Sequence, residues 1–314
     1  MHHFTRSTLL GLLGLVWLAL SSSSVLAAEG GSSLYIPGLA GDIALAVSSE
    51  PGLQVGNSIY VQTSSVDRAV LQGVVNAGLD VDVVLNFFGG FYTFKPSVLG
   101  GTYSIGAVIP FGYAELDAQV TGPRGNSVGV SGDTFSLADI AFVPLRLNWN
   151  IGDFHFKFFE AIIAPTGDYD VDDVINLGRN YWAFDTVAAF TWLSTKTGTE
   201  FSMEPGLLAN TRNDDTEYTT GLEFHVDFTI NQFLAETFAI GFRGYYYRQV
   251  TGDSGRGARL GDFQGESLGI GPGVFWQPKF AGGKLVILAK WLHDVTTTRR
   301  LEADYYSLAF AWTF

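Results

Sequence analysis

The chain has 314 residues, no cysteine and a formal net charge of −13, with 18 basic against 31 acidic side chains. This acidic balance excludes a nucleic-acid-binding surface and a basic helix on a membrane surface. The lack of cysteine excludes a disulfide framework, so an exported chain of this size needs another source of stability, such as a closed hydrogen-bonded sheet.

Residues 1–27 predict a secretory signal peptide. A single cation, Arg6, precedes an apolar run over residues 9–20, and small residues follow it as far as Ala28. The alternative is a membrane anchor, but this run is too short for a helix that must cross about 30 Å of hydrocarbon. We therefore expect export, with cleavage after Ala27 or Ala28.

Residues 28–53 are rich in glycine, serine and proline, with one short alternating apolar piece at Ile43, Leu45 and Val47. This composition suits an irregular segment better than a strand. Two interpretations remain open. The segment is either a frayed periplasmic terminus or an insert that enters the lumen of a barrel and narrows it.

From residue 54 onward, apolar and polar residues alternate as they do in strands with one apolar face. In residues 221–230, for example, Phe224 and Val226 share one face, while His225 and Asp227 share the other. We predict twelve strands, at 54–64, 80–94, 102–119, 136–149, 154–164, 181–194, 201–211, 217–230, 237–249, 265–276, 284–294 and 304–314.

The alternation fits either a soluble β-sandwich or a barrel whose apolar face meets lipid, and the lengths of the connections favour the barrel. Long connections (65–79, 120–135, 165–180 and 250–264) fall at one end and short ones mostly at the other. Bacterial outer-membrane barrels place short turns in the periplasm and longer loops outside. We predict an all-β protein, in which residues 54–314 form a transmembrane antiparallel β-barrel of about twelve strands (roughly 10–14).

Polar residues on the inner faces of these strands are candidates for the lining of the lumen. They are Asp82, Asn86, Arg146, Asn148, Glu223, His225, Asp227, Arg243, Tyr245, Tyr247, Gln249 and Lys290. A narrow barrel needs such residues to pair with one another and fill its interior, and the same residues would line a path for a solute. Both interpretations stay open, because the sequence alone does not separate them.

The last predicted strand carries apolar side chains at every second position and ends on an aromatic residue. These side chains are Tyr306, Leu308, Phe310, Trp312 and Phe314. The pattern resembles the C-terminal signal of bacterial outer-membrane proteins, which the barrel-assembly machinery recognises. Its apolar face is expected to contact lipid and, in the outer leaflet, lipopolysaccharide.

Three further motifs invite a chemical interpretation. GNSVG (125–129) and GDSG (252–255) resemble serine-hydrolase signatures, but neither has the strand–turn–helix elbow or the histidine partner that such catalysis needs. DYDVDD (168–173) carries four carboxylates without the glycine and distal glutamate of an EF-hand, so a solvated acidic loop is favoured over a calcium site. We expect no enzyme activity, no metal and no cofactor.

Five longer stretches resemble the outer-membrane proteins of the meta-pathway phenol-degradation family. They are SLYIPGLAGD (33–42), APTGDYD (164–170), INLGRNYWAF (175–184), EYTTGLEFHVDF (217–228) and GYYYRQVTGDSGRGARLGDFQGESLGIGPGVFW (244–276). The resemblance implies a transmembrane β-barrel that passes aromatic or other small hydrophobic molecules inward, and it supplies no functional residues. Tyr245 and Tyr247 could face a phenol-like solute, or they could pack against the N-terminal segment. The alternative function is a structural or adhesive outer-membrane barrel without transport.

Overall fold

The computed structural model describes residues 33–70, 75–121, 127–258, 264–279 and 284–314. The predicted signal peptide and residues 28–32 lie outside these ranges. In the part of the chain that is described, no helix has the length and apolar character needed to span a membrane.

The described chain folds into thirteen β-strands. They are β1 (Gly52–Val70), β2 (Val75–Val98), β3 (Gly101–Thr121), β4 (Ser127–Leu137), β5 (Ile140–Ile151), β6 (Phe154–Ala164), β7 (Ala183–Ser194), β8 (Thr199–Asn210), β9 (Glu223–Ala235), β10 (Phe238–Gln249), β11 (Glu266–Trp276), β12 (Leu285–Thr298) and β13 (Glu302–Thr313).

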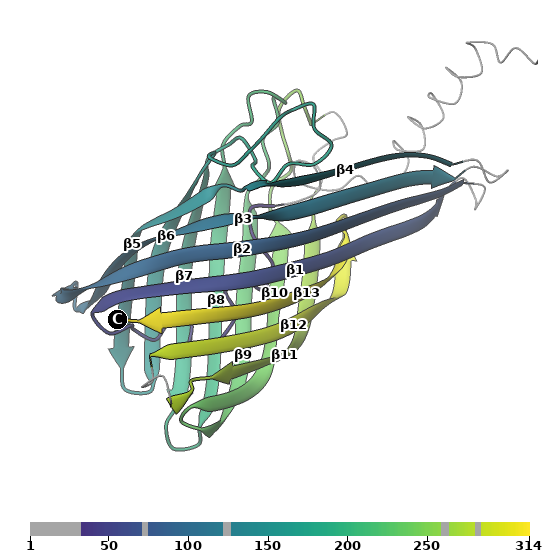
Figure 1. The fold of residues 1–314 in the computed structure, drawn as a ribbon. Helices are drawn as coiled ribbons and strands as arrows, with labels where there is room; N and C mark the ends of the chain where they lie inside the picture. The colour runs from purple at the N-terminus through teal and green to yellow at the C-terminus, as the bar shows by residue number, and fades with distance from the viewer. Residues whose placement is uncertain (1–32, 71–74, 122–126, 259–263, 280–283) are drawn as a thin grey trace, which may run out of the picture.

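All pairings are antiparallel, and the sheet closes because β1 pairs with both β2 and β13. Two of the thirteen strands, β4 and β5, together occupy one position in the wall, since both pair with β3 and only Ala138 and Asp139 separate them. The wall is therefore a closed barrel of twelve strand positions (Figure 1). The predicted fold class is confirmed.

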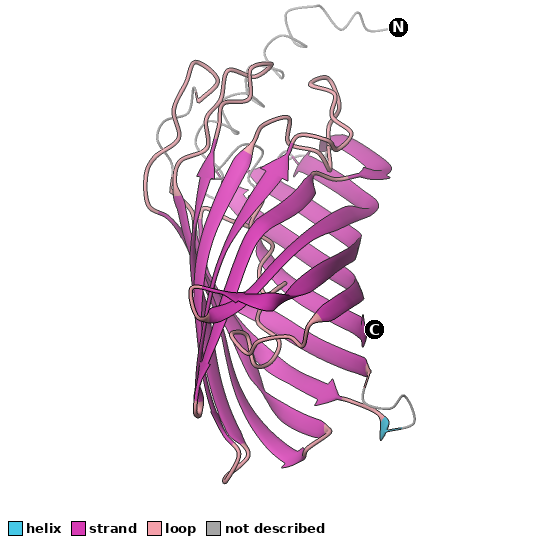
Figure 2. Cartoon of the chain, turned by 90° about the vertical axis from the view of Figure 1, so that its left-hand side faces the viewer, coloured by secondary structure: helices cyan, strands magenta, loops and turns pink. Residues whose placement is uncertain are grey.

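Apolar side chains cover the outside of the barrel, as the alternation predicts. On β13, Ala303 and Tyr305 are buried on the inner face, while Tyr306, Phe310 and Trp312 are exposed on the outer face. Because successive side chains of a strand point to opposite faces, this pattern gives an apolar belt outside and a separate interior. The closed wall is visible in Figure 2.

The first strands are longer than predicted. β1, β2 and β3 have 19, 24 and 21 residues, and the pairing of β1 with β2 continues to Val70 and Val75. The predicted loops at 65–79 and 120–135 are thus largely strand, and β1–β4 project beyond the rest of the barrel in Figure 1. The reverse correction applies at residues 217–222, which precede β9 as irregular chain.

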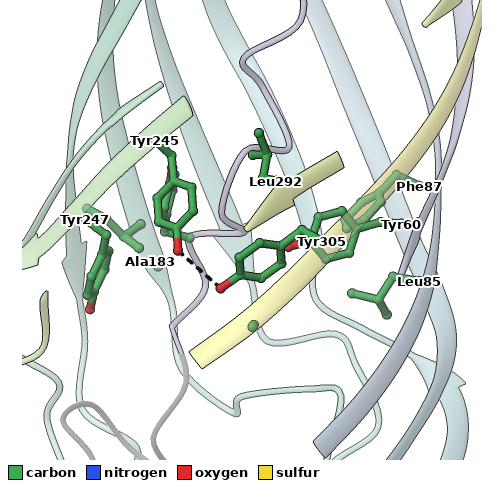
Figure 3. Close-up of a cluster of buried hydrophobic side chains, with 11 residues drawn as sticks. Tyr60, Leu85, Phe87, Ala183, Tyr245, Tyr247, Leu292 and Tyr305 are labelled. Atoms are coloured by element: carbon green, nitrogen blue, oxygen red, sulfur yellow. Dashed lines mark hydrogen bonds between the residues drawn. The ribbon is translucent and has the colours of Figure 1, made fainter. Parts of the chain in front are cut away.

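The interior holds a cluster of buried side chains, of which Figure 3 shows the centre. Tyr60 of β1, Leu85 and Phe87 of β2, Leu292 of β12 and Tyr305 of β13 belong to it. The N-terminal segment supplies further members, so chain from before the first strand packs inside the wall.

Candidate functional site: a lumen occupied by the N-terminal segment

Residues 33–51, here named the lumen segment, run through the inside of the barrel without forming a strand. Ser33 contacts Glu223 at the start of β9, at the end that carries the longer connections. The segment leads into Gly52 at the opposite end, where the N–H of Phe314 donates to the carbonyl of Leu53 over 3.0 Å. The segment therefore passes along the length of the lumen, and the purple trace among the strands in Figure 3 shows part of its course.

Tyr35 is the principal aromatic anchor of the segment. Its ring stacks on the His225 ring with centroids 4.4 Å apart and on the Tyr247 ring at 5.8 Å. Its hydroxyl donates a hydrogen bond of 3.0 Å to Asp227, and the Tyr245 ring lies 6.2 Å away. Two neighbouring wall strands supply all four partners, because His225 pairs with Tyr247 and Asp227 with Tyr245 between β9 and β10.

A second group of contacts holds the start of the segment. The Ser33 hydroxyl donates to the fully buried carboxylate of Glu223, which also accepts a 2.7 Å hydrogen bond from the Tyr247 hydroxyl. The guanidinium of Arg300 lies 4.1 Å from the Tyr247 ring centroid. A buried carboxylate needs such donors and nearby positive charge to remain ionised.

The middle of the segment turns tightly against the wall. Gly38 has φ of +67°, and a Cβ there would lie 2.2 Å from the Leu292 side chain, so both backbone geometry and space favour glycine. The Lys290 ammonium forms a 2.7 Å ion pair with Asp42 and donates to the carbonyl of Leu39 over 3.3 Å. This pair is the charged link between the segment and β12.

The lower part of the segment is fixed through its backbone. The N–H of Ala44 donates to Glu200 over 2.8 Å, and the N–H of Ala46 donates to the Thr191 hydroxyl over 3.0 Å. The Asn148 amide donates in turn to the carbonyl of Ala46 over 3.1 Å. Wall side chains thus replace the strand partners that these backbone groups lack.

Glycines on the inner face of β11 make room for large side chains of β10. A Cβ at Gly269 would lie 2.4 Å from the Tyr245 ring, and one at Gly273 would lie 2.6 Å from the Arg243 side chain. The alternation of β11 therefore has a steric cause, since its outer positions face lipid and its inner positions accommodate neighbours.

Ten of the twelve predicted lining residues lie on the inner face. Arg146, Asn148, Glu223, His225, Asp227, Tyr245, Tyr247 and Lys290 contact the lumen segment, while Arg243 hydrogen-bonds to Asn231 of the wall and Gln249 to Asp253. Of the two interpretations that the sequence leaves open for Tyr245 and Tyr247, the structure shows packing against the N-terminal segment.

The assignment of Asp82 and Asn86 to the inner face needs correction. The alternation of β2 places both with the exposed side chains of Val84 and Phe88 on the outer face, while Leu85 is buried inside. The Asn86 amide and the Asn57 amide exchange hydrogen bonds of 2.7 and 3.2 Å across the β1–β2 pair. Mutual pairing satisfies these polar groups, so polarity alone did not indicate the face.

Several residues of the interior are not among those predicted from the sequence. Tyr35 lay in a segment without periodicity, and Arg300 lies in the turn between β12 and β13. Glu200 precedes the start predicted for its strand, although its alternation with Ser202 and Glu204 on the inner face was a usable signal. Asp294 accepts a 3.2 Å hydrogen bond from Tyr305, and its position four residues after Lys290 on the same face of β12 was a usable signal.

The serine and acidic motifs have structural partners. In GDSG, the Asp253 carboxylate accepts hydrogen bonds from the Tyr218 hydroxyl (2.6 Å) and the N–H of Gly221 (3.0 Å), which tie two loops together. GNSVG begins in residues outside the described chain. In the acidic loop, Asp170 accepts from the N–H of Asp172 over 2.9 Å. Among the described residues, no group of three or more His, Cys, Asp or Glu is placed to hold a metal ion.

A family model described as "Putative MetA-pathway of phenol degradation" matches residues 48–310. The chain belongs to this family. The predicted resemblance is thereby confirmed, and the match covers most of the wall but begins within the lumen segment.

Two solved structures are similar to the barrel to different degrees. The COG4313 outer membrane channel from Pseudomonas putida F1 has a TM-score of 0.69 and 16% identity, with 87% of this chain and 99% of that chain covered. The translocator domain of the autotransporter NalP from Neisseria meningitidis has a TM-score of 0.44 and 11% identity, over 86% of this chain and 91% of that one. No curated protein matches the chain. At 16% identity, the first likeness shows a shared fold.

Proposed function

We propose that this member of the phenol-degradation family is a gated outer-membrane channel for the uptake of small hydrophobic or aromatic compounds, phenol-like degradation substrates among them. The lipid-facing belt supports a place in the outer membrane, in contact with lipid and lipopolysaccharide. The barrel-assembly machinery would insert it there.

One observation carries the proposal. The lumen segment is held in the barrel by side-chain contacts and an ion pair, and it has no place in the ladder of strand pairings. It can therefore leave the lumen without breaking a hydrogen bond between wall strands. A purely structural barrel has no need of a filling that can be removed in this way.

The chemistry of the interior supports aromatic solutes. A row of rings crosses the lumen, here named the aromatic row. It runs Phe87, Tyr60, Tyr305, Tyr245, Tyr35, Tyr247, with neighbouring centroids between 5.7 and 6.3 Å apart. Aromatic rings at such distances attract one another in tilted or stacked arrangements, and their hydroxyls supply polar contacts.

Uptake by whole cells tests this function. Cells with and without the gene should be given a labelled phenol, a labelled alkane and a labelled disaccharide at low concentration. We expect several-fold slower entry of the phenol without the gene, and unchanged entry of the disaccharide. Equal phenol entry in both strains would favour the alternative, a barrel that serves structure or adhesion.

A further inference from the structure

The side chain of Tyr35 is itself a phenol, equivalent to 4-methylphenol tethered to the lumen segment. The side chains around it make the contacts that a binding site makes with a phenol. Two rings of the wall stack on it, at 4.4 and 5.8 Å between centroids and with interplanar angles of 22° and 11°. Its hydroxyl donates to the Asp227 carboxylate over 3.0 Å, and 8% of its surface is exposed.

The wall alone builds this slot, which we define by His225, Asp227 and Tyr247. His225 is held by Asp185 of β7, with Nε2 2.9 Å from the carboxylate. Tyr247 is held by its hydrogen bond to Glu223 and by the Arg300 guanidinium on its ring. Because these supports do not involve Tyr35, the slot keeps its walls when the segment leaves.

The polar atoms of the slot favour a ligand with a hydroxyl. Asp227 is 1% exposed, and its Oδ1 has no hydrogen-bond partner within the described residues, while Oδ2 accepts from Tyr35. A buried carboxylate that loses its donor is left with an uncompensated cost of desolvation. An aromatic hydrocarbon could fill the space between the rings, but only a phenol would also donate to Asp227.

We propose that the slot formed by His225, Asp227 and Tyr247 is a binding site for phenols, and that Tyr35 occupies it as a built-in competitor. A free phenol takes the place of the Tyr35 ring, and the segment loses its aromatic anchor. A tethered group competes as if present at millimolar concentration, so phenols displace it only at comparable levels. This inference deepens the proposed function, on which it rests for the consequence that binding opens the path.

Direct binding measures the competition. Full-length mature protein and its Tyr35→Ala variant, both in detergent, are dialysed against labelled 4-methylphenol and, separately, labelled toluene. Emptying the slot should tighten binding of 4-methylphenol by at least about tenfold, because the competitor is gone. The affinity for toluene should rise clearly less, since toluene cannot donate a hydrogen bond to Asp227. Val47→Ala is the matched control, because it trims the segment near its lower end, and it should leave binding of 4-methylphenol at the wild-type level.

Two further variants complete the test. Tyr35→Phe keeps the ring in place and should raise affinity for 4-methylphenol by less than Tyr35→Ala does. Tyr35→Ala combined with Asp227→Leu should lose the preference for 4-methylphenol over toluene. Heat-modifiable migration in gels checks that each barrel is folded.

The inference is overturned if the folded Tyr35→Ala variant binds 4-methylphenol no more tightly than wild type. It is also overturned if the affinity of Val47→Ala for 4-methylphenol rises as much as that of Tyr35→Ala. Dialysis does not measure transport, so the two claims fail separately. If Tyr35→Ala binds 4-methylphenol more tightly, but cells with and without the gene take up the labelled phenol equally, the proposed function is refuted and the binding site stands. If the gene speeds uptake of the phenol but Tyr35→Ala binds 4-methylphenol no more tightly than wild type, the binding site is refuted and the proposed function stands.

Discussion

The ion pair between Lys290 and Asp42 is the residue-scale contact that most directly couples the lumen segment to the wall. The Lys290 side chain is 3% exposed and the Asp42 side chain 22% exposed. A second pair, between Lys157 and Glu204 at 2.5 Å, joins only wall strands β6 and β8, and its side chains are 13% and 5% exposed. The two lysines allow the same substitution to be made with and without a partner on the segment.

Replacement of Lys290 by methionine should favour release of the segment. Loss of one charge-assisted partner costs about 2 kcal/mol, or roughly 30-fold in the equilibrium between docked and released segment. Since the chain has no cysteine, Ala46→Cys provides a single reporter at a position with 0% exposure. The rate at which a maleimide labels this cysteine should rise about 30-fold in Lys290→Met.

Lys157→Met is the control for that experiment, and it should leave the labelling rate near that of the unsubstituted protein. If both lysine variants accelerate labelling equally, the barrel as a whole has loosened, and the ion pair to Asp42 has no special part in holding the segment.

Residue-scale prediction worked where the membrane fixes polarity. Most polar residues of the alternating strands point inward, and this rule places Glu223, Asp227 and Lys290 on the inner face, where they are buried. The rule is wrong for Asp82 and Asn86, which lie on the outer face of β2, where the Asn86 amide is satisfied by the Asn57 amide. Tyr35 could not be found, because a segment without periodicity gives no sign of what surrounds it.

At the scale of elements, β13 is the strand that closes the barrel. It pairs with β12 on one side and with β1 on the other, from Gln54 opposite Thr313 to Ser65 opposite Glu302. Its predicted outer residues are all exposed, from 36% for Trp312 to 67% for Phe314. Their proposed role as a signal for assembly rests on the same exposed stripe.

Deletion of Phe314, or its replacement by aspartate, should lower the amount of protein in the outer membrane several-fold. A damaged last strand leaves an edge whose backbone groups lipid cannot satisfy. Immunoblots of outer-membrane fractions measure the effect. Ser254→Ala is the control, because Ser254 lies in a loop where its backbone pairs with Thr219, and equal levels for both variants would contradict the assignment.

The strands themselves were largely predictable, and their ends were not. Alternation identified every position in the wall because each strand shows one face to lipid. Residues 120–135 are rich in glycine and serine, so the sequence predicts a loop where β3 ends and most of β4 lies. Conversely, residues 217–222 alternate by chance and form a loop that Asp253 ties down.

At the scale of the whole molecule, the lumen segment is proposed to act as a plug. A barrel of twelve strand positions is wider than the eight strands whose side chains alone fill an interior. Here chain from before the first strand supplies the missing filling, from Ser33 at one end to Ser49 near the other. Removal of this filling should leave a wall whose pairings are all intact.

Single-channel conductance in planar bilayers tests this claim most directly. The mature protein is compared with a variant that keeps the signal peptide but lacks the segment between Ala28 and Pro51. We predict that the truncated protein still forms a barrel and conducts small ions several-fold better than the full mature protein, because water and ions fill the vacated lumen. Equal conductances would contradict the account and reduce the segment to a passive part of the fold.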